Sequence, residues 1–298
     1  MKTLLTAVLC LILPALVSAQ ERDAETKKQL AAATEKIARA DVGKAVTVET
    51  ADLLLVAALP DAKAKSLAAF GQKVYETASA ALKNDKKEVL WPGKLTVFLL
   101  KDREDFSKFF RKVLQERPDI RETVRVNLKG NEPYLVVLLP EGPMVRDADV
   151  QAEFGSAVAE ALLKQKAEGK SANALLPDWL RVGFGNAIVN KMDGQAGRAG
   201  AMRLKLRSVF VKSLKNPMPA KAWDVWGADR PKEFEALATS VTEYFVFGPE
   251  AERFPKMLQS YRTSDENQNP TTEKALELLD LKPDALDTAW RAWVVKQR

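Results

Sequence analysis

Apolar residues between positions 147 and 191 recur at helical spacing in two runs, separated by a polar stretch that contains Gly and Ser. This spacing is typical of amphipathic helices, whose apolar stripe faces a core. Asp147 and Asp149 favour the positive N-terminus of the first helix. Pro177 suits the first turn of the second. The pattern therefore predicts two helices joined by a polar loop in the middle of the chain.

Short runs of β-branched and apolar residues precede this pair of helices. They predict one or two strands over 46–58, and further strands over 94–100, 123–128 and 133–139. The last two flank residues 129–132, a hairpin-like turn that contains Gly130. Helical spacing predicts two helices between these strands, over 61–83 and 103–114.

The chain after the central pair reads as helical to its end. Helices are predicted over 201–214, 232–247 and 249–261, followed by a polar loop over 263–272 and a last helix that opens at Pro283. Strands thus gather in the first half and helices in the second. This order predicts an α+β fold, with a sheet-bearing N-terminal lobe and a mainly helical C-terminal lobe around the central helix.

Residues 1–19 have the pattern of a secretory signal, with Lys2, an apolar core and small residues before Gln20. The apolar run is short for a membrane anchor, and Pro14 interrupts it. We therefore expect a secreted or periplasmic protein without a transmembrane segment. Residues 20–44 are charged and rich in Ala, which fits a leader that is either a mobile helix or disordered.

The composition removes most metal-binding chemistry. The sequence contains no His, and its one Cys, Cys10, lies in the predicted signal. His and Cys supply most zinc ligands, and His is the commonest general base near neutral pH. The exported chain is therefore expected to have no disulfide, no Cys/His zinc site and no cofactor.

Two central blocks carry a resemblance to a known family. Ala152-Glu153-Phe154-Gly155-Ser156 resembles the HEFGH form of the zincin motif without its histidines. Residues 176–185, LPDWLRVGFG, resemble the downstream block of the gluzincins, the thermolysin-like zinc metallopeptidases of the peptidase MA clan. The junction at 101–106 and the closing helix also resemble exported members. The resemblance implies a zincin-like layout over roughly 45–298, either as one domain or as lobes over 45–146 and 147–298.

The resemblance also implies that the metal site is lost. In the family, two His on one helix face and a downstream Glu hold Zn²⁺, while the Glu of the motif activates the bound water. Those ligand positions are here Ala152, Ser156 and Val182, and Glu153 stands at the position of the base. A second register, with Glu160 at a ligand position, loses the base as well. Both registers predict no metal.

Two further features have two readings each. Ser156, Glu160 and Lys164 could form a nucleophilic set, but an ordinary Glu160–Lys164 helix pair is favoured. Seven basic residues and no acidic one lie between 194 and 223, as a patch for an anionic surface or as a solvated helix face. They are Arg198, Arg203, Lys205, Arg207, Lys212, Lys215 and Lys221. Nucleic acid is not expected as a partner of an exported protein.

The family layout suggests where a partner would bind. Zincins hold an extended peptide along an edge strand above the motif helix, and the candidate groove here comprises Tyr134, Val136, Leu138, Glu153 and Glu160. We therefore expect an exported, catalytically inactive pseudopeptidase that binds a peptide or an exported protein. The alternatives are a non-zinc enzyme that uses Glu153 as acid/base and a purely structural exported protein.

Overall fold

The computed structural model describes residues 3–85, 90–130, 132–169, 173–193, 200, 201, 204, 234–265 and 267–296, with side chains described from residue 22 onward. The chain divides into two compact units. The first comprises Met1–Gln72 and Val89–Val150, and the second comprises Lys73–Glu88 and Gln151–Arg298. The architecture is α+β, which confirms the predicted fold class.

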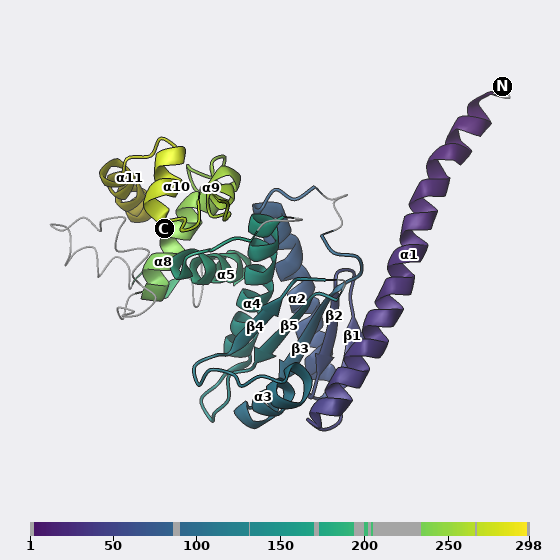
Figure 1. The fold of residues 1–298 in the computed structure, drawn as a ribbon. Coiled ribbons are helices and arrows are strands. Elements are labelled where there is room, and N and C mark those ends of the chain that lie inside the picture. The colour runs from purple at the N-terminus through teal and green to yellow at the C-terminus, as the bar shows by residue number, and fades with distance from the viewer. Residues whose placement is uncertain are drawn as a thin grey trace. The chain divides into compact units, whose positions relative to one another are not determined.

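A mixed sheet forms the centre of the first unit (Figure 1). Its strands are β1 (Val46–Glu49), β2 (Leu53–Ala57), β3 (Leu95–Leu100), β4 (Val124–Asn127) and β5 (Tyr134–Leu138), in the order β1-β2-β3-β5-β4. The parallel pairs β2–β3 and β3–β5 form the middle, and the antiparallel strands β1 and β4 form the edges. All four predicted strand segments are present, with two strands in 46–58, and β4 and β5 pair in antiparallel fashion on either side of the predicted turn.

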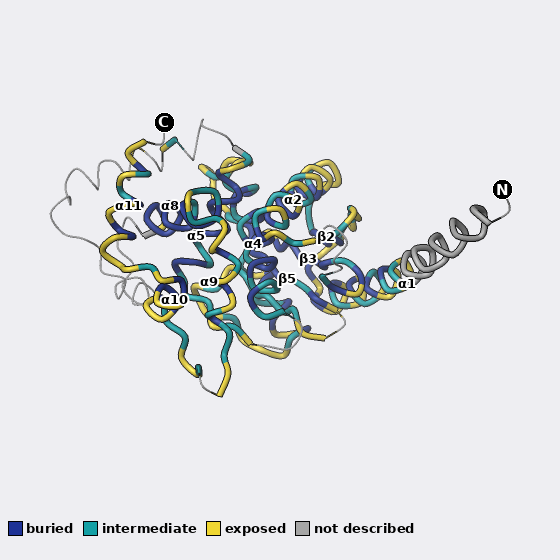
Figure 2. The backbone as a smooth tube through the Cα atoms, turned by 90° about the horizontal axis from the view of Figure 1, so that it is seen from above, coloured by how far each residue is buried: buried dark blue, intermediate teal, exposed yellow. Residues whose placement is uncertain are grey.

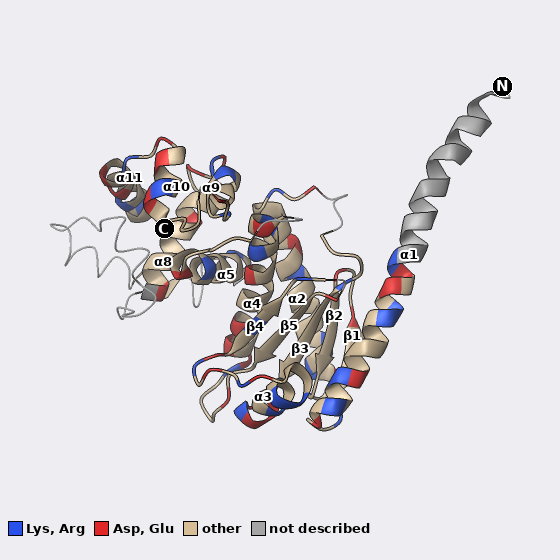
Figure 3. Cartoon of the chain, in the orientation of Figure 1, with Lys and Arg blue, Asp and Glu red and all other residues tan. Residues whose placement is uncertain are grey.

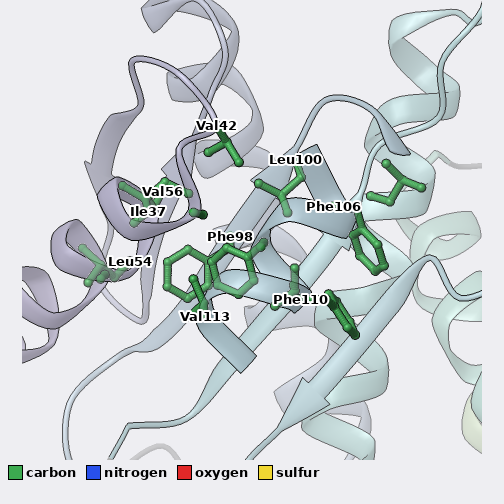
Figure 4. Close-up of a cluster of buried hydrophobic side chains, with 14 residues drawn as sticks. Ile37, Val42, Leu54, Val56, Phe98, Leu100, Phe106, Phe110 and Val113 are labelled. Atoms are coloured by element: carbon green, nitrogen blue, oxygen red, sulfur yellow. The ribbon is translucent and has the colours of Figure 1, made fainter. Parts of the chain in front are cut away.

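One face of the sheet carries a buried apolar cluster (Figure 4). Helix α3 (Arg103–Phe109) and a π-helical turn, η1 (Phe110–Leu114), cover it together with the C-terminal part of α1 (Thr3–Ala40). The predicted helix over 103–114 is therefore present, but its last turn is a π-turn that ends in a left-handed Gln115.

Helix α1 corrects the expectation of a separate leader. Ala33, Ile37 and Ala40 of α1 and the following Val42 belong to the buried cluster, and parts of the described end of α1 are dark blue in Figure 2. Charged residues lie between them in the sequence (Figure 3), and Glu35 and Arg39 are exposed. Burial of apolar side chains at helical spacing fixes this segment to the sheet, so the end of the 20–44 segment is part of the fold.

In the part of the second unit that the structure describes, the main elements are helices. They are the last turns of α2 (Asp61–Ala81), most of α4 (Asp147–Glu168), α5 (Asp178–Asp193), α8 (Phe234–Val246), α9 (Phe254–Ser260), α10 (Thr272–Leu278) and α11 (Pro283–Lys296). The predicted central pair corresponds to α4 and α5. The predicted helix over 201–214 and the basic run from Arg198 to Lys221 lie outside the described residues, except for isolated positions of that helix. No helix in the described part has the length and apolar character needed to cross a membrane.

Candidate functional site

The two motif helices pack directly against each other. The hydroxyl of Ser156 on α4 lies 3.4 Å from Oδ1 of Asn186 on α5. A Cβ added at Gly185 would lie only 2.9 Å from Cβ of Ser156, so glycine permits this close approach. Ser156 therefore contacts α5 about one helical turn beyond Val182.

The positions that correspond to the metal ligands differ in exposure. Ala152 is 3% exposed, whereas Ser156 and Val182 are half-buried. Glu153, at the position of the base, is half-buried as well. Ala and Val offer no donor atom, and a Ser hydroxyl is a poor zinc ligand, so these side chains do not fit a zinc ion.

An ion-pair network lies one turn from Ser156. Arg181 of α5 lies 2.6 Å from Asp178 and 3.5 Å from Glu160 of α4. Burial lowers the pKa of the Arg181 guanidinium, but the charges of Glu160 and Asp178 and the hydrogen bond to Asp178 outweigh burial, so its net pKa is raised. The guanidinium stays charged and links the two helices.

This network also changes the reading of the Ser156, Glu160 and Lys164 set. Glu160 has an ionic partner on α5, and Lys164 lies 3.9 Å from Glu168, one turn further along α4. The favoured Glu160–Lys164 pair is not the contact that the structure gives for Lys164. Both side chains are engaged in ion pairs of the kind that stabilise helices.

The prediction that the strand of Tyr134, Val136 and Leu138 forms the edge of a binding groove is wrong. Tyr134, Val136 and Leu138 lie on β5, which pairs with β3 on one side and β4 on the other. An interior strand has no free row of backbone groups, so it cannot accept an added strand. Val136 and Leu138 point into the apolar cluster, and Tyr134 packs against it, so they are core residues. Glu153 and Glu160 belong to the second unit.

The edge on this side of the sheet is β4. The Leu138 amide donates to the Thr123 carbonyl at 2.8 Å, which makes these two residues a directly bonded pair. Bonded pairs alternate along an antiparallel ladder, so Arg125 and Asn127 also face β5. The backbone groups of Val124 and Val126 therefore point away from the sheet. The backbone N–H and C=O groups on the outer side of this edge therefore belong to Val124 and Val126.

The edge strand is held to the helices beneath it by Arg125. Its guanidinium lies 4.8 Å from the ring centre of Phe110 and pairs with Glu116 and Glu122. Arg103 donates to the Glu122 carbonyl at 2.6 Å and stacks on Phe106. These contacts fix β4 and its preceding loop while leaving its outer backbone groups without a neighbouring strand among the described residues.

Sequence reasoning missed the helix contacts that build the site. Gly183 packs α5 against Ala238 and Thr242 of α8, in the same way that Gly185 packs against α4. Thr242 is fully buried, and its hydroxyl has no hydrogen-bond partner among the described residues. Two glycines inside one helix are costly, and that cost was the available signal of close packing.

Among the described residues, no group of three or more acidic, His or Cys side chains is placed to hold a metal ion. No protein-family model and no curated protein matches the chain. The resemblance to gluzincins therefore depends on the motif residues of the sequence alone.

Proposed function

We propose that this chain is an exported, catalytically inactive gluzincin-like protein that acts by binding a partner. The observation that carries the proposal is the contact of Ser156 with α5 at Gly185 and Asn186. The family requires these two helices to pack together, and here Ser156 contacts α5 about one turn beyond Val182. The three ligand positions, Ala152, Ser156 and Val182, carry no good zinc ligand. Export is supported by the signal pattern of residues 1–19.

Binding is favoured over catalysis by the chemistry of the site. Hydrolysis by the zinc route needs a polarised water, and Ala152 and Val182 cannot hold the ion that polarises it. Glu160, one helical turn from Ser156, pairs with Arg181 across the two helices. An enzyme that uses Glu153 and a purely structural protein are the competing functions.

The mode of binding that the sheet supports is strand addition at β4. The outward backbone groups of Val124 and Val126 can bond an extended segment of a peptide or an exported protein. An open edge usually carries an aggregation risk, which short length and charge reduce. This edge has four residues, one of which is Arg125.

Restoring the ligands tests the family geometry. In the triple variant Ala152→His, Ser156→His, Val182→Glu, two imidazoles and one carboxylate converge if α4 and α5 cross as in a gluzincin. Elemental analysis of the purified variant is then expected to give about one zinc per chain, because such a set binds Zn²⁺ tightly. The unchanged protein is expected to carry none.

Two controls make the result decisive. The double variant Ala152→His, Ser156→His lacks the third ligand and should bind zinc much more weakly than the triple variant. The double variant Ser156→His, Val182→Glu changes only half-buried positions and reports whether a buried His at 152 disturbs folding. A folded triple variant that retains no zinc would contradict the family geometry.

A further inference from the structure

The open edge of β4 has a defined beginning. In the alternation that turns the backbone groups of Val124 and Val126 outward, the preceding outward residue is Glu122. Its amide donates to the Asp119 carbonyl at 3.1 Å, and its carbonyl accepts the Arg103 guanidinium at 2.6 Å. Both backbone groups of Glu122 are therefore occupied, so an added segment can start to pair only at Val124 and passes over the preceding loop.

Hydrogen bonds hold the chain in place on both sides of β4. The bond between Glu122 and Asp119 closes a four-residue turn, and the Arg121 amide inside this turn donates to Asp119 Oδ1 at 2.8 Å. After the strand, the Lys129 amide donates to Asn127 Oδ1 at 3.1 Å. Arg121 and Lys129 are both exposed. The two ends of the open edge thus each carry a cation on a hydrogen-bonded backbone.

The carboxylates of this region are already engaged, whereas three of its four cations are not. Glu116 and Glu122 both pair with Arg125, and Asp119 accepts an amide of its own turn. The remaining cations of 116–129 have no ion-pair partner among the described residues, and they are Arg117, Arg121 and Lys129. The charge that a partner meets at the ends of β4 is therefore positive.

The middle of the edge favours apolar side chains. Val124 and Val126 are in register with Val137 and Leu135, which are fully buried, so the two valines lie on the same face of the sheet as these core residues. Both valines are half-buried. Partner residues directly opposite Val124 and Val126 share that face, where apolar cross-strand pairs are favourable.

We propose, on the basis of the strand addition at β4 proposed above, that the added segment has an apolar centre and acidic flanks. Its apolar side chains lie opposite Val124 and Val126, and its carboxylates pair with Arg121 at one end and Lys129 at the other. A cation at each end of the edge suits an acidic flank whether the segment runs parallel or antiparallel to β4. Segments with basic flanks are disfavoured, because like charges then meet at both ends.

The test compares capped peptides that share the centre Val-Thr-Val and differ only in their flanks. Each end carries two Glu, two Gln or two Lys. Fluorescence anisotropy of the labelled peptides with the full chain measures Kd, and residue-resolved hydrogen exchange of the Val124 and Val126 amides locates binding. The Glu peptide should bind about 3–10-fold more tightly than the Gln peptide, as exposed ion pairs allow, and the Lys peptide should bind most weakly. About 0.5 M salt should reduce these differences.

Single variants separate contact at β4 from the overall positive charge of the chain. Arg121→Gln and Lys129→Gln should each weaken the Glu peptide about threefold and leave the Gln peptide unchanged. Neither side chain has an ion pair among the described residues, so the thermal midpoint should not change. Lys44→Gln is the matched control, since it removes an exposed cation that precedes β1 at the opposite edge of the sheet. It should change neither affinity nor thermal midpoint.

The possible results distinguish the charge preference from strand addition itself. Equal protection of the Val124 and Val126 amides by all three peptides would leave strand addition standing and refute the acidic flanks, as would tighter binding of the Lys peptide. A loss of affinity in Lys44→Gln as large as that in Arg121→Gln would show attraction by net charge alone and would refute them too. If none of the peptides protected these amides, strand addition at β4 would itself be refuted, together with the charge preference.

Discussion

At the scale of single residues, two glycines decide how closely α5 packs against its neighbouring helices, because each lies where a Cβ atom would not fit. Gly183 and Gly185 lie two positions apart on α5 and approach different helices. Gly183 faces the Ala238 carbonyl and Thr242 of α8, and Gly185 faces Ser156 of α4. The helix accepts the low propensity of glycine because each missing Cβ lets a neighbouring backbone come close.

Alanine normally stabilises a helix relative to glycine, but at Gly183 and Gly185 it should destabilise the protein. A Cβ at Gly183 would overlap a backbone carbonyl, which cannot move aside, so Gly183→Ala should destabilise the protein by about 1–3 kcal/mol or more. The free energy of unfolding from urea titration measures this.

Gly185→Ala provides the graded comparison. Its nearest atom would be Cβ of Ser156 at 2.9 Å, and a small shift of α4 can relieve that contact. Its destabilisation should be smaller than that of Gly183→Ala. If both variants were more stable than the unchanged protein, as propensity alone predicts, the close helix packing would be refuted.

At the scale of elements, the order of the strands in the sheet decides which strand lies at an edge that a partner can reach. β5 is enclosed by β3 and β4, so the strand next to the motif helix in the sequence is not the strand that a partner can reach. β4 precedes β5 in the chain but lies outside it in the sheet. The loop before β4 is held through Arg103 and Arg125, so the edge is built into the fold and is not a frayed end.

The exchange of backbone amides along β4 should alternate. The amides of Arg125 and Asn127 bond to β5 and should exchange slowly with solvent deuterium, whereas those of Val124 and Val126 should exchange quickly. Residue-resolved hydrogen exchange of the isolated protein measures both sets. Protection of the valine amides in the isolated chain would mean that the chain itself covers the edge.

Val126→Pro extends this measurement to the partner. Proline removes an N–H that β5 does not use, and it is tolerated on an edge strand with that N–H outward. The β4–β5 pairing should survive, while protection of the Val124 amide by a library of extended peptides should be lost. Arg125→Pro, which removes a paired N–H, is the contrasting variant and should disturb the sheet itself.

At the scale of the whole molecule, the N-terminal helix belongs to the sheet. Ile37 is 7% exposed within the apolar cluster, next to Ala33 and Ala40. Lys112 of η1 pairs with Asp41, and the Arg39 guanidinium donates to the Val113 carbonyl, so polar contacts border the same surface. The first unit therefore needs α1 to cover one face of its sheet.

Ile37→Ala should measure this contribution. Loss of a buried Ile side chain costs about 2–5 kcal/mol, because the methyl groups leave a cavity behind. Glu35→Ala changes an exposed residue two positions earlier and should stay within about 0.5 kcal/mol of the unchanged protein. Equal stability of the two variants would show that this segment is the mobile leader that its composition suggested.

The sequence by itself determined the kinds of elements and the lack of His and Cys ligands in the central blocks. Runs of β-branched and apolar residues located β1 to β5, and helical spacing located α4 and α11, because both signals are local to one segment of the chain. Pro177 marked the start of α5. The absence of His, and of donors at Ala152 and Val182, is a matter of residue identity. No fold can supply ligands that the chain lacks.

Only the tertiary structure decided the strand order, the burial of α1 and the packing of the two glycines. The run Tyr134–Leu138 has the same apolar composition whether it lies at an edge or inside, because the sequence of one strand does not encode its neighbours. Most of the α1 sequence is charged, and its narrow apolar stripe at 33, 37 and 40 becomes recognisable as core only because it packs in one cluster with Phe98 and Phe109. These features depend on contacts between residues far apart in the chain, which form only when the whole unit has folded.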